Sequence, residues 1–362
     1  MLREPLRSSF DTLISTEASD IEIVDPTRNN GWDPLVSSYP ESTFFHGSVW
    51  LKVLSKTYNH KPLALCCSRL GEARALVPFL EVASRFLGCR GISLPFTDFC
   101  HPLIANECDA PAIFGAVRAL ARERNWKHFE FRGALPSNLS ARPSLAFYRH
   151  VLDLQGNTQF RFAKLESSVR RAIRRARKSG LEIELSGSRD TMRDFYRLHV
   201  QTRRRHGLPP QPFSFFRNIH EEIVKPGFGF LCVAKRGSQP VASAIFFHTD
   251  KHAVFKFGAS DDRRQSLRGN SLVMWSAIEH LAQKGFEKLH LGRTSCEHYG
   301  LRRFKLGWGA TEELTAYFRY DMRLNDWTAS RDRVFGFHNE IFSRLPLPVN
   351  RLLGAILYPH LD

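Results

Sequence analysis

Residues 253–292 have the sequence AVFKFGASDDRRQSLRGNSLVMWSAIEHLAQKGFEKLHLG. The first eight residues are rich in β-branched, aromatic and small types and predict a strand over 253–260. Apolar residues at helical spacing then predict a helix over 270–284, which stops at Gly285, and a second strand follows over 288–292. A helix that connects two strands in this way indicates an α/β (α+β) domain, and this segment therefore decides the fold class.

The first half of the chain has the same order of elements. It predicts a hairpin of strands 63–70 and 73–83 that turns at Gly71-Glu72, followed by an extended stretch at 91–104. A helix at 110–124 and two short strands at 128–132 and 148–154 come next. The second half predicts a hairpin at 228–235 and 240–249 before the segment quoted above. Because 125–132 matches 285–292 in pattern, we interpret the chain as a structural duplication with an offset of about 160 residues. Two unrelated α/β stretches are the alternative.

The predicted elements divide the chain into four parts. Residues 1–30 are polar and irregular and predict a loosely held lead-in, whereas 31–155 and 156–325 are the two predicted domains. Residues 326–362 predict a C-terminal tail that is too short and too broken by proline to span a membrane. We expect this tail to pack on the domains, with contact to the inner membrane as the alternative. The remaining predicted helices are 47–57, 190–206 and 214–224.

The composition limits the class of protein. A length of 362 residues suits two domains, and a hydrophobic share of 43% with 29 Phe is typical of a globular chain. No stretch approaches the roughly 20 apolar residues of a membrane-spanning helix, and the first twenty residues contain no apolar run of secretory-signal length. We therefore expect a cytoplasmic protein. Seven cysteines, odd in number and without a CxxC pair, predict ordinary buried thiols and no metal site.

The positive charge is concentrated in one segment. Lys and Arg exceed Asp and Glu by 16, and residues 160–207, with fourteen basic and five acidic residues, carry +9 of that excess. A predicted helix over 168–178 has one apolar stripe and six cations elsewhere, so we expect it to pack on one side only. Six cations in nine residues repel one another, and an anionic partner would relieve this repulsion. RNA phosphate, a nucleotide-linked sugar or acidic lipid would each suffice, and a solvated face is the alternative.

A mostly antiparallel sheet with one helix crossing between its later strands resembles the acetyltransferase (GNAT) fold. Two such units in tandem resemble the Fem aminoacyltransferases, and the second half is similar to the BioF-like acyltransferase domain of FemAB-related proteins. The ending RLPLP (344–348) with NRLLG (350–354) resembles the subgroup associated with exosortase/PEP-CTERM and exopolysaccharide loci. The blocks that carry the likeness are SVRRAIRRARKSG (168–180), TRRRHGLPPQP (202–212) followed by Phe215-Phe216, GAS (258–260), RGN (268–270), LGR (291–293) and FKLGWGA (304–310).

The resemblance implies two tandem GNAT-like acyltransferase domains, with mixed, mostly antiparallel sheets and crossing helices. In that fold the donor's pyrophosphate binds at the N-terminus of the helix after the fourth strand, where free N–H groups and the helix dipole favour an anion. The matching residues are Arg268, Gly269, Asn270 and Ser271, and Arg293 lies beyond the next strand as a further donor-binding residue. An exposed loop capped by Asn270 is the alternative.

The sequence does not identify a single donor or a single acceptor. The loop before Asn270 is longer and poorer in glycine than the usual acetyl-CoA loop, so both acyl-CoA and aminoacyl-tRNA stay open as donor substrates, and no cofactor is expected to remain bound. His206 ends a predicted helix beside three arginines, and we predict it in the cleft between the domains as the catalytic base or an acceptor-binding residue. The alternative is that these cations only complement the helix dipole. Arg170, Arg174, Arg203, Lys305 and Trp308 complete the predicted substrate-binding set, although Trp308 also suits the core.

The sequence therefore predicts a transferase that moves an acyl or aminoacyl group from an activated donor to an amine or hydroxyl. By resemblance the acceptor is a precursor of the cell envelope or of an exopolysaccharide. The resemblance also suggests tRNA as a partner and a peripheral contact with the inner membrane. The rival prediction is a non-catalytic protein that holds RNA or anionic lipid on a transferase fold.

Overall fold

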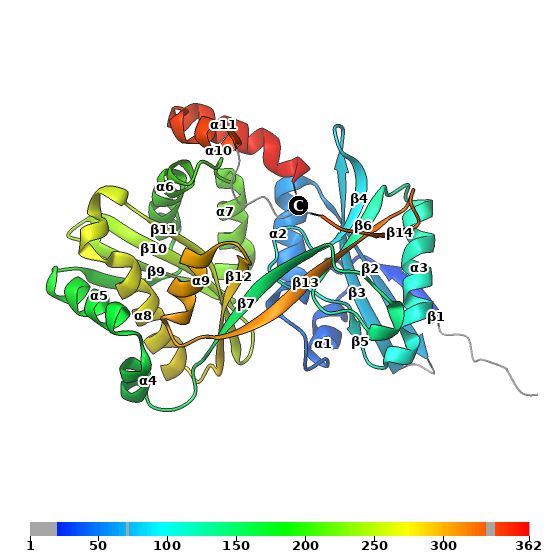
Figure 1. Ribbon diagram of the computed structural model, residues 1–362, viewed down its shortest axis with the longest axis horizontal. Coiled ribbons are helices and arrows are strands. Elements are labelled where there is room, and N and C mark those ends of the chain that lie inside the picture. The colour runs from blue at the N-terminus through cyan, green and yellow to red at the C-terminus, as the bar shows by residue number, and fades with distance from the viewer. Residues whose placement is uncertain (1–19, 70–71, 331–336, 362) are drawn as a thin grey trace, which may run out of the picture.

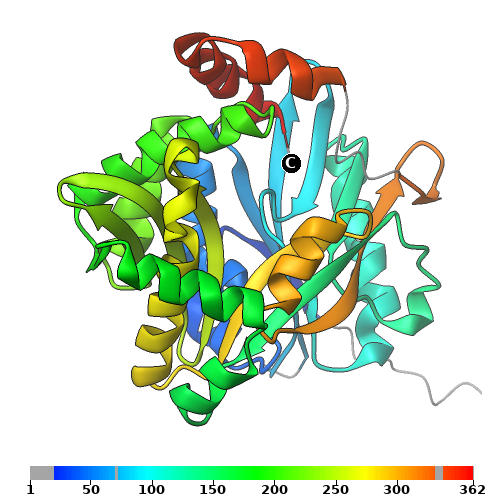
Figure 2. The same ribbon diagram turned by 60° about the vertical axis from the view of Figure 1, so that its left-hand side comes forward.

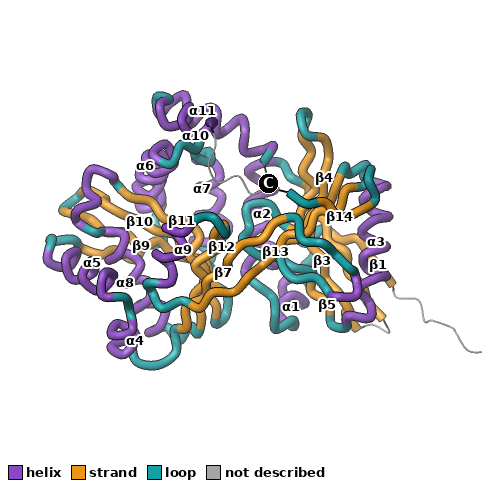
Figure 3. Tube along the Cα trace, in the orientation of Figure 1, coloured by secondary structure: helices purple, strands orange, loops and turns teal. Residues whose placement is uncertain are grey.

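Two α/β halves lie side by side in the structure, a computed structural model that describes residues 20–69, 72–330 and 337–361 (Figure 1). The strands described form a single sheet that runs through both halves, with helices around it (Figure 3). The strands of the first half are β1 Asp20–Val24, β2 Lys61–Arg69, β3 Glu72–Ser84, β4 Gly88–Ser93, β5 Leu103–Ile104, β6 His128–Arg132 and β7 Leu145–Asp153. Those of the second half are β8 Glu182–Ser186, β9 Gly229–Arg236, β10 Gln239–His248, β11 His252–Ser260, β12 Lys288–Ser295, β13 Thr311–Asp321 and β14 Asp326–Thr328.

The helices follow the predicted order. Those of the first half are α1 Trp32–Ser37, α2 Ser48–Tyr58 and α3 Ala110–Glu123. The second half contains α4 Thr158–Lys164, α5 Ser167–Lys178, α6 Arg189–Arg205, α7 Phe213–Ile219, α8 Gly269–Gln283 and α9 Tyr299–Leu306, and the chain ends with α10 Phe337–Arg344 and α11 Leu347–Leu357. A π-helical turn, His220–Val224, extends α7 and completes the predicted helix 214–224.

The order of the strands confirms the duplication. Within the sheet the order is β1-β2-β3-β4-β6-β13-β7-β12-β11-β10-β9-β8, with β5 and β14 paired to β3 and β13. Among the described pairs, only β4 with β6 and β11 with β12 are parallel. These two pairs hold equivalent places in the two halves, each after a hairpin and on either side of a crossing helix. The prediction of two mixed, mostly antiparallel units is therefore confirmed.

Each half receives a strand from the other at the centre of the sheet. β7, the last strand of the first half, pairs with β12 of the second half, where Leu152 lies opposite Leu289. β13, from the second half, inserts between β6 and β7 and places Phe318 opposite Phe131. The segments 31–155 and 156–325, which the sequence assigns to two domains, thus share one continuous hydrogen-bonded ladder.

An aromatic core joins the two halves on one face of this sheet. The ring of Phe44 stacks on that of Phe247 at 4.8 Å between centroids, and Trp50 of α2 meets Phe215 of α7 edge to face at 6.0 Å. All four side chains are at most 3% exposed. Because these contacts bury large rings from both halves, the two halves pack as one body.

On the other face, α8 packs against the second half of the sheet, and α5 packs on α8. Trp275 and Ile278 of α8 are at most 1% exposed, and Ile173 and Ala176 of α5 are fully buried. Six of the other ten positions of α5 are Arg or Lys, as its sequence predicts for a helix that packs on one side only.

The prediction for the N-terminus needs a correction. Residues 1–19 lie outside the described residues, but Asp20–Val24 form the edge strand β1, antiparallel to β2 with Ile21 opposite Cys67. These five residues are therefore not irregular, because pairing to the outer edge of β2 outweighs their polar character. The turn residue Gly71 of the predicted hairpin also lies outside the described residues, while its two strands are confirmed as β2 and β3.

The C-terminal segment, residues 337–361, lies across both halves, and we call it the strap (Figure 1). In the second half, a Cβ added to Gly354 of α11 would lie 2.0 Å from the carbonyl oxygen of Pro210, so the backbones are in direct contact. In the first half, the ring of Tyr358 stacks on that of Tyr58 at 6.4 Å. Arg203 Nη2 donates a hydrogen bond of 2.8 Å to the Tyr358 hydroxyl, which in turn donates to the oxygen of Pro209. The predicted packing of the tail is confirmed.

The strap should contribute measurably to stability. Tyr358 is 5% exposed, so we expect Tyr358→Ala to lower the free energy of unfolding by about 3 kcal/mol through the cavity and the lost hydrogen bonds. Urea denaturation measures this change. Tyr299→Ala is the control, because Tyr299 is 73% exposed, and it should change stability by less than about 0.5 kcal/mol. Equal effects of the two substitutions would mean that the strap does not hold the halves together.

Candidate active site

The two parallel strands of the second half separate after three residue pairs. β11 and β12 are paired at residues 252–254 and 288–290, and beyond this point β11 continues along β10 while β12 follows β7. Side chains alternate between the two faces of a strand. Ala253 and Leu289 accordingly pack with α8, whereas Val254 and His290 face the first half of the chain. Beyond Val254 and His290 the two strands therefore diverge and leave a gap in the ladder of backbone hydrogen bonds.

Lys305 of α9 closes part of this gap. Its Nζ donates hydrogen bonds to the carbonyl oxygens of Gly292 and Arg293, at 2.8 and 3.0 Å, which are backbone groups that β11 does not reach. The side chain is 4% exposed, and this burial, together with the charge of Arg293 and against that of Asp98, lowers the pKa of Lys305 to about 8. The predicted substrate-binding lysine is thus a buried amine that holds the strands apart.

An ion pair between the two halves, Asp98 of the first and Lys256 of the second, lies near Lys305. Lys256 of β11 donates to Asp98 Oδ2 at 3.1 Å and to the carbonyl oxygen of Phe96 at 2.7 Å. Burial raises the pKa of Asp98, but the charges of Lys256 and Arg293 outweigh it and the net pKa is lowered, so the carboxylate stays ionised. Burial also lowers the pKa of Lys256 in spite of the neighbouring carboxylate. Three cations, Lys256, Arg293 and Lys305, face this one carboxylate, and the site therefore favours an additional anion.

Asp98, Lys256, Lys305 and Arg293 form a group that we call the inner cluster. The guanidinium of Arg293 lies over the rings of Phe147 and Tyr317, at 4.3 and 4.8 Å from their centroids. These rings come from β7 and β13, the two strands that the halves exchange. The structure therefore does not bring Arg293 together with residues 268–271, with which the sequence grouped it.

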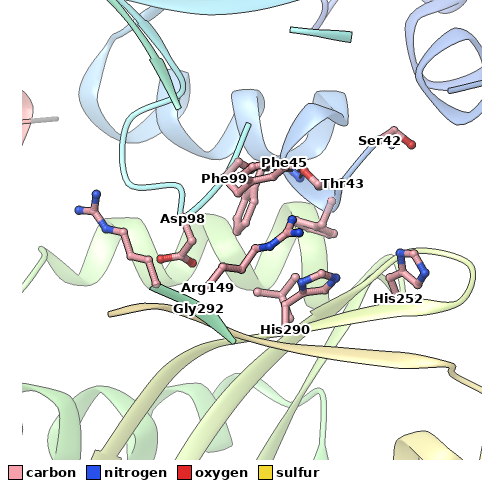
Figure 4. Close-up of a pocket in the computed structure, with 12 residues that line it drawn as sticks. Ser42, Thr43, Phe45, Asp98, Phe99, Arg149, His252, His290 and Gly292 are labelled. Carbon is pink, nitrogen blue, oxygen red and sulfur yellow. Dashed lines mark hydrogen bonds between the residues drawn. The ribbon is translucent and has the colours of Figure 1, made fainter. Parts of the chain in front are cut away.

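Between the halves lies a chamber that is lined on one side by Phe45, Asp98 and Phe99, and on the other by Arg149, His252, His290 and Arg293 (Figure 4). We call it the interdomain chamber, and its own volume is only about 40 Å³. It adjoins a wider groove of about 560 Å³ that shares the side chains of Arg149, His252 and His290. Arg149 lies 4.7 Å from the ring centroid of Phe99 and forms an ion pair with Glu313.

The histidines of this chamber are available as proton acceptors. Burial, aided by the charge of Arg149, lowers the pKa of His290 to about 4, so its imidazole is neutral at neutral pH. Its ring lies 5.9 Å from that of His252, and Val254 opposite it is the last paired residue before the gap. A neutral imidazole at this place can accept a proton from a group that reacts in the gap.

A second cavity, of about 790 Å³, lies on the α8 side of the gap. It is lined by the loop before α8, by the first turn of α8 and by α5, and we call it the basic groove. Its cations are Arg171, Arg175, Arg264 and Arg268, and Asp261 is its only acidic lining residue among those described. The two segments that the sequence singled out, 168–178 and 268–271, therefore form one site.

The first turn of α8 suits an anion. No described side chain caps this helix, and Arg268 precedes it in the left-handed conformation with φ of 58°. A Cβ on Gly269 would lie 3.1 Å from the Cβ of Ala242, so a side chain here would crowd β10 at the start of α8. The alternative interpretation, an exposed loop capped by Asn270, is not supported, because no side-chain cap is found among the described residues and Asn270 Nδ2 donates to Ser260 Oγ at 3.1 Å. The N-terminal dipole of α8 thus faces the basic groove without a capping side chain.

The basic helix presents a different pair of arginines from the predicted one. Arg171 and Arg175 line the basic groove. Arg170 instead donates a hydrogen bond of 3.2 Å to the carbonyl oxygen of Ala163, and Arg174 lies 5.7 Å from the ring centroid of Phe162. The buried residues Ile173 and Ala176 could have indicated the correct face, because they fix the rotation of α5. Trp308 is 1% exposed and contributes to both the core and the groove, which confirms its assignment to the core.

His206 lies at the exposed C-terminal end of α6. Its carbonyl oxygen accepts a hydrogen bond from Asn339 of the strap, and partial burial with the charges of Arg205 and Arg203 lowers the pKa of its imidazole. It lines none of the cavities found in the described part of the chain. Arg203, which the sequence assigned to the substrate, is bonded to Pro209 and Tyr358 and supports the strap.

The described residues contain no cluster of three or more His, Cys, Asp or Glu that could hold a metal ion. The cysteines are free thiols. Burial is confirmed for Cys67, Cys100 and Cys232, but the prediction is wrong for Cys108, which is exposed. The charged and titratable residues that line the basic groove are four arginines and Asp261, and those that line the interdomain chamber are Arg149, Arg293, His252, His290 and Asp98.

Comparisons with known proteins agree with this architecture. Residues 163–313 match the model of the acetyltransferase (GNAT) domain family. The fold is similar to FemX, at 15% identity and a TM-score of 0.65 over 80% of this chain and 95% of that chain. It is also similar to L-PGS from Bacillus licheniformis, at 12% identity and a TM-score of 0.52 over 93% of this chain and 98% of that chain. A tandem GNAT protein from the clavulanic acid biosynthesis pathway is similar at 10% identity and a TM-score of 0.51 over 84% of this chain and 99% of that chain. No similar sequence is found among curated proteins.

These findings confirm the predicted fold, a GNAT domain in the second half and a FemX-like tandem arrangement of the whole. Together they support an acyltransferase.

The buried amine of Lys305 leads to a testable pH dependence. The unfolded chain titrates near its ordinary pKa of 10.5 and the folded amine at about 8, so between these values the unfolded state binds more protons and stability rises with pH. Relative to Lys305→Met, the wild type should gain about 1–3 kcal/mol of unfolding free energy from pH 8 to pH 10. Urea denaturation at each pH measures the unfolding free energy, and Lys225→Met, at an exposed position, is the control. If the difference in unfolding free energy between the wild type and Lys305→Met does not change with pH, the amine of Lys305 stays charged.

Proposed function

We propose, from the premise that residues 163–313 are a GNAT acetyltransferase domain, that the protein transfers an acyl or aminoacyl group from an activated donor to an amine or hydroxyl. The observation that carries the proposal is the gap between β11 and β12, which has a basic groove on one face of the sheet and the interdomain chamber on the other. A donor and an acceptor that enter from opposite faces would meet there.

The basic groove suits the anionic part of the donor. Phosphate groups at the first turn of α8 would accept hydrogen bonds from its free N–H groups and from Arg268, with Arg171 and Arg175 across the groove. Acyl-CoA and aminoacyl-tRNA both carry such phosphates, and both remain proposed donors. The number of cations and the size of the groove, about 790 Å³, also suit a ligand larger than a single phosphate.

The reaction is a direct acyl transfer. The nucleophilic nitrogen or oxygen of the acceptor attacks the donor's acyl carbon and loses its proton, and the bond from this carbon to the donor's sulfur or oxygen breaks. Backbone N–H groups of β11 near Gly258 and the cations of the inner cluster would stabilise the negative charge on the carbonyl oxygen. Positioning of the two substrates would supply much of the rate, so no covalent intermediate is required.

The chamber indicates the kind of acceptor. Arg149 and Arg293 line it, and the neighbouring cluster has more cations than anions, which favours an acceptor with a phosphate or carboxylate near its reacting group. A cell-envelope or exopolysaccharide precursor of this kind is our proposed acceptor, and a cytoplasmic location would suit it.

The rival function is non-catalytic binding of RNA or anionic lipid. The cations of α5 would support either function, but the buried cluster at the gap has no role in such binding. Thermal shift with acyl-CoA, aminoacyl-tRNA and nucleotide sugars, each compared with bare RNA and acidic liposomes, distinguishes the two. Stabilisation by bare RNA or liposomes alone would support the rival.

The rotation of α5 permits a matched test of donor binding. We expect Arg171→Glu with Arg175→Glu to weaken binding of the donor by about tenfold or more and to flatten its salt dependence. The pair Arg170→Glu with Arg174→Glu makes the same change of charge on another face of the same helix, and should have a smaller effect. Calorimetry with acyl-CoA and with aminoacyl-tRNA measures both. An equal loss of donor affinity in the two double variants would mean that α5 attracts the donor only by its overall charge and does not contact it.

The proton acceptor can be tested in the same way. We propose that His290 accepts the proton, whereas the sequence assigned this role to His206. His290→Gln should lower kcat by about 100-fold or more with unchanged donor affinity, and His206→Gln should leave kcat within about twofold. In the wild type, kcat/KM should fall on the acid side only as the pH approaches 4, the pKa of His290. If His206→Gln loses activity and His290→Gln does not, the proton acceptor is His206, as the sequence predicted.

A further inference from the structure

Apolar side chains are exposed at the edge of the molecule that carries the strap. Phe86 and Leu87, in the turn between β3 and β4, are 79% and 52% exposed. On α11, Val349, Leu352 and Ile356 are 42%, 63% and 52% exposed. A single exposed apolar residue needs no explanation, but five of them at one edge do.

The exposed residues of α11 form one stripe. Positions 349, 352 and 356 are spaced by three and four residues, so their side chains lie on one face of the helix. The opposite face holds Asn350 and Gly354, which are buried against the rest of the protein. α11 therefore presents an apolar face to solvent.

The turn at Phe86 and the strap are in direct contact. The ring of Phe86 meets that of His360 edge to face at 5.3 Å, and Arg90 Nη2 donates a hydrogen bond of 2.6 Å to the carbonyl oxygen of His360. Figures 1 and 2 show the β3–β4 hairpin beside the strap in both views. We call the surface formed by Phe86, Leu87, Val349, Leu352 and Ile356 the apical surface.

The charged residues within the two segments that carry the apical surface are basic, and Glu81, Asp98, Glu340 and Asp362 border these segments in the sequence. The segments 82–97 and 341–361 contain no Asp or Glu. Arg85 adjoins Phe86 and Arg344 precedes α11, and both are exposed, whereas Arg351 lies 5.5 Å from the ring centroid of Tyr196 on α6. Apolar side chains bordered by arginines fit a surface that offers both an apolar layer and negative charge.

We propose that the apical surface docks on an anionic lipid bilayer. The apolar side chains would enter the boundary between headgroups and acyl chains, and Arg85 and Arg344 would face the lipid phosphates. The association is peripheral: across residues 20–69, 72–330 and 337–361, every helix is too short or too polar to cross a membrane. Since α11 and the hairpin turn are held by the packed strap, the surface is already formed before it meets the lipid. This proposal does not depend on the acyl transfer proposed above.

Vesicle binding tests the proposal directly. The full-length protein should pellet with phosphatidylcholine vesicles that contain about 30% phosphatidylglycerol, and more weakly with pure phosphatidylcholine. Phe86→Ser with Leu87→Ser, and separately Leu352→Ser with Ile356→Ser, should each lower the partition coefficient by about tenfold or more. Arg85→Glu with Arg344→Glu should remove the preference for anionic vesicles.

The matched control is Phe160→Ser with Tyr299→Ser. Both residues are 73% exposed, but they lie on α4 and α9, away from the strap, and this variant should bind vesicles like the wild type. Circular dichroism and melting temperature establish that each variant is folded. Equal binding by the control and the apical variants would overturn the proposal. It would also be overturned if the wild type does not bind vesicles but forms dimers that the apical substitutions dissociate, because the occupant would then be a second copy of the chain.

Discussion

The pairing of β13 with β7 at the centre of the sheet is the constraint on which the rest of the structure depends. Because each half takes a strand from the other, the ladder of hydrogen bonds is continuous from β1 to β8, and the halves cannot separate without breaking it. The same exchange brings Phe147 and Tyr317 under Arg293, and thereby fixes the wall of the interdomain chamber. The aromatic core around Trp50 and Phe247 then fills the angle between the halves.

The sequence predicted the elements of this fold well, because each is encoded locally. Strand β6 at 128–132 has the bounds that its alternating residues indicate, and α8 ends one residue before the predicted position. The exchange of β7 and β13 was not predictable, since a strand's own residues do not identify its partner in a sheet. The strand at residues 20–24 was missed for a similar reason, because its stability comes from the edge of β2.

The site was predicted only where neighbouring residues form it. The basic helix was found from its composition and the turn at 268–271 from the resemblance to the GNAT fold, and they line one cavity. The pair of Asp98 and Lys256 was not found, because the two residues come from different halves and meet only through the tertiary fold. Likewise, His290 is one of 15 histidines, and its place in the lining of the interdomain chamber, at the last paired residues of β11 and β12, is set only by the tertiary fold. Chemistry that depends on desolvation cannot be inferred before the packing is known.

The exchanged strand also has a consequence for biosynthesis. While the chain leaves the ribosome, β6 is complete long before β13 exists, so the first half exposes the unpaired edge of a buried strand until residue 321 has been made. Native pairing of this edge joins distant parts of the chain and is therefore slow to form. A nascent chain in this state would be open to pairing with other unfinished strands. The cell's need to shield that edge during synthesis follows from the topology alone.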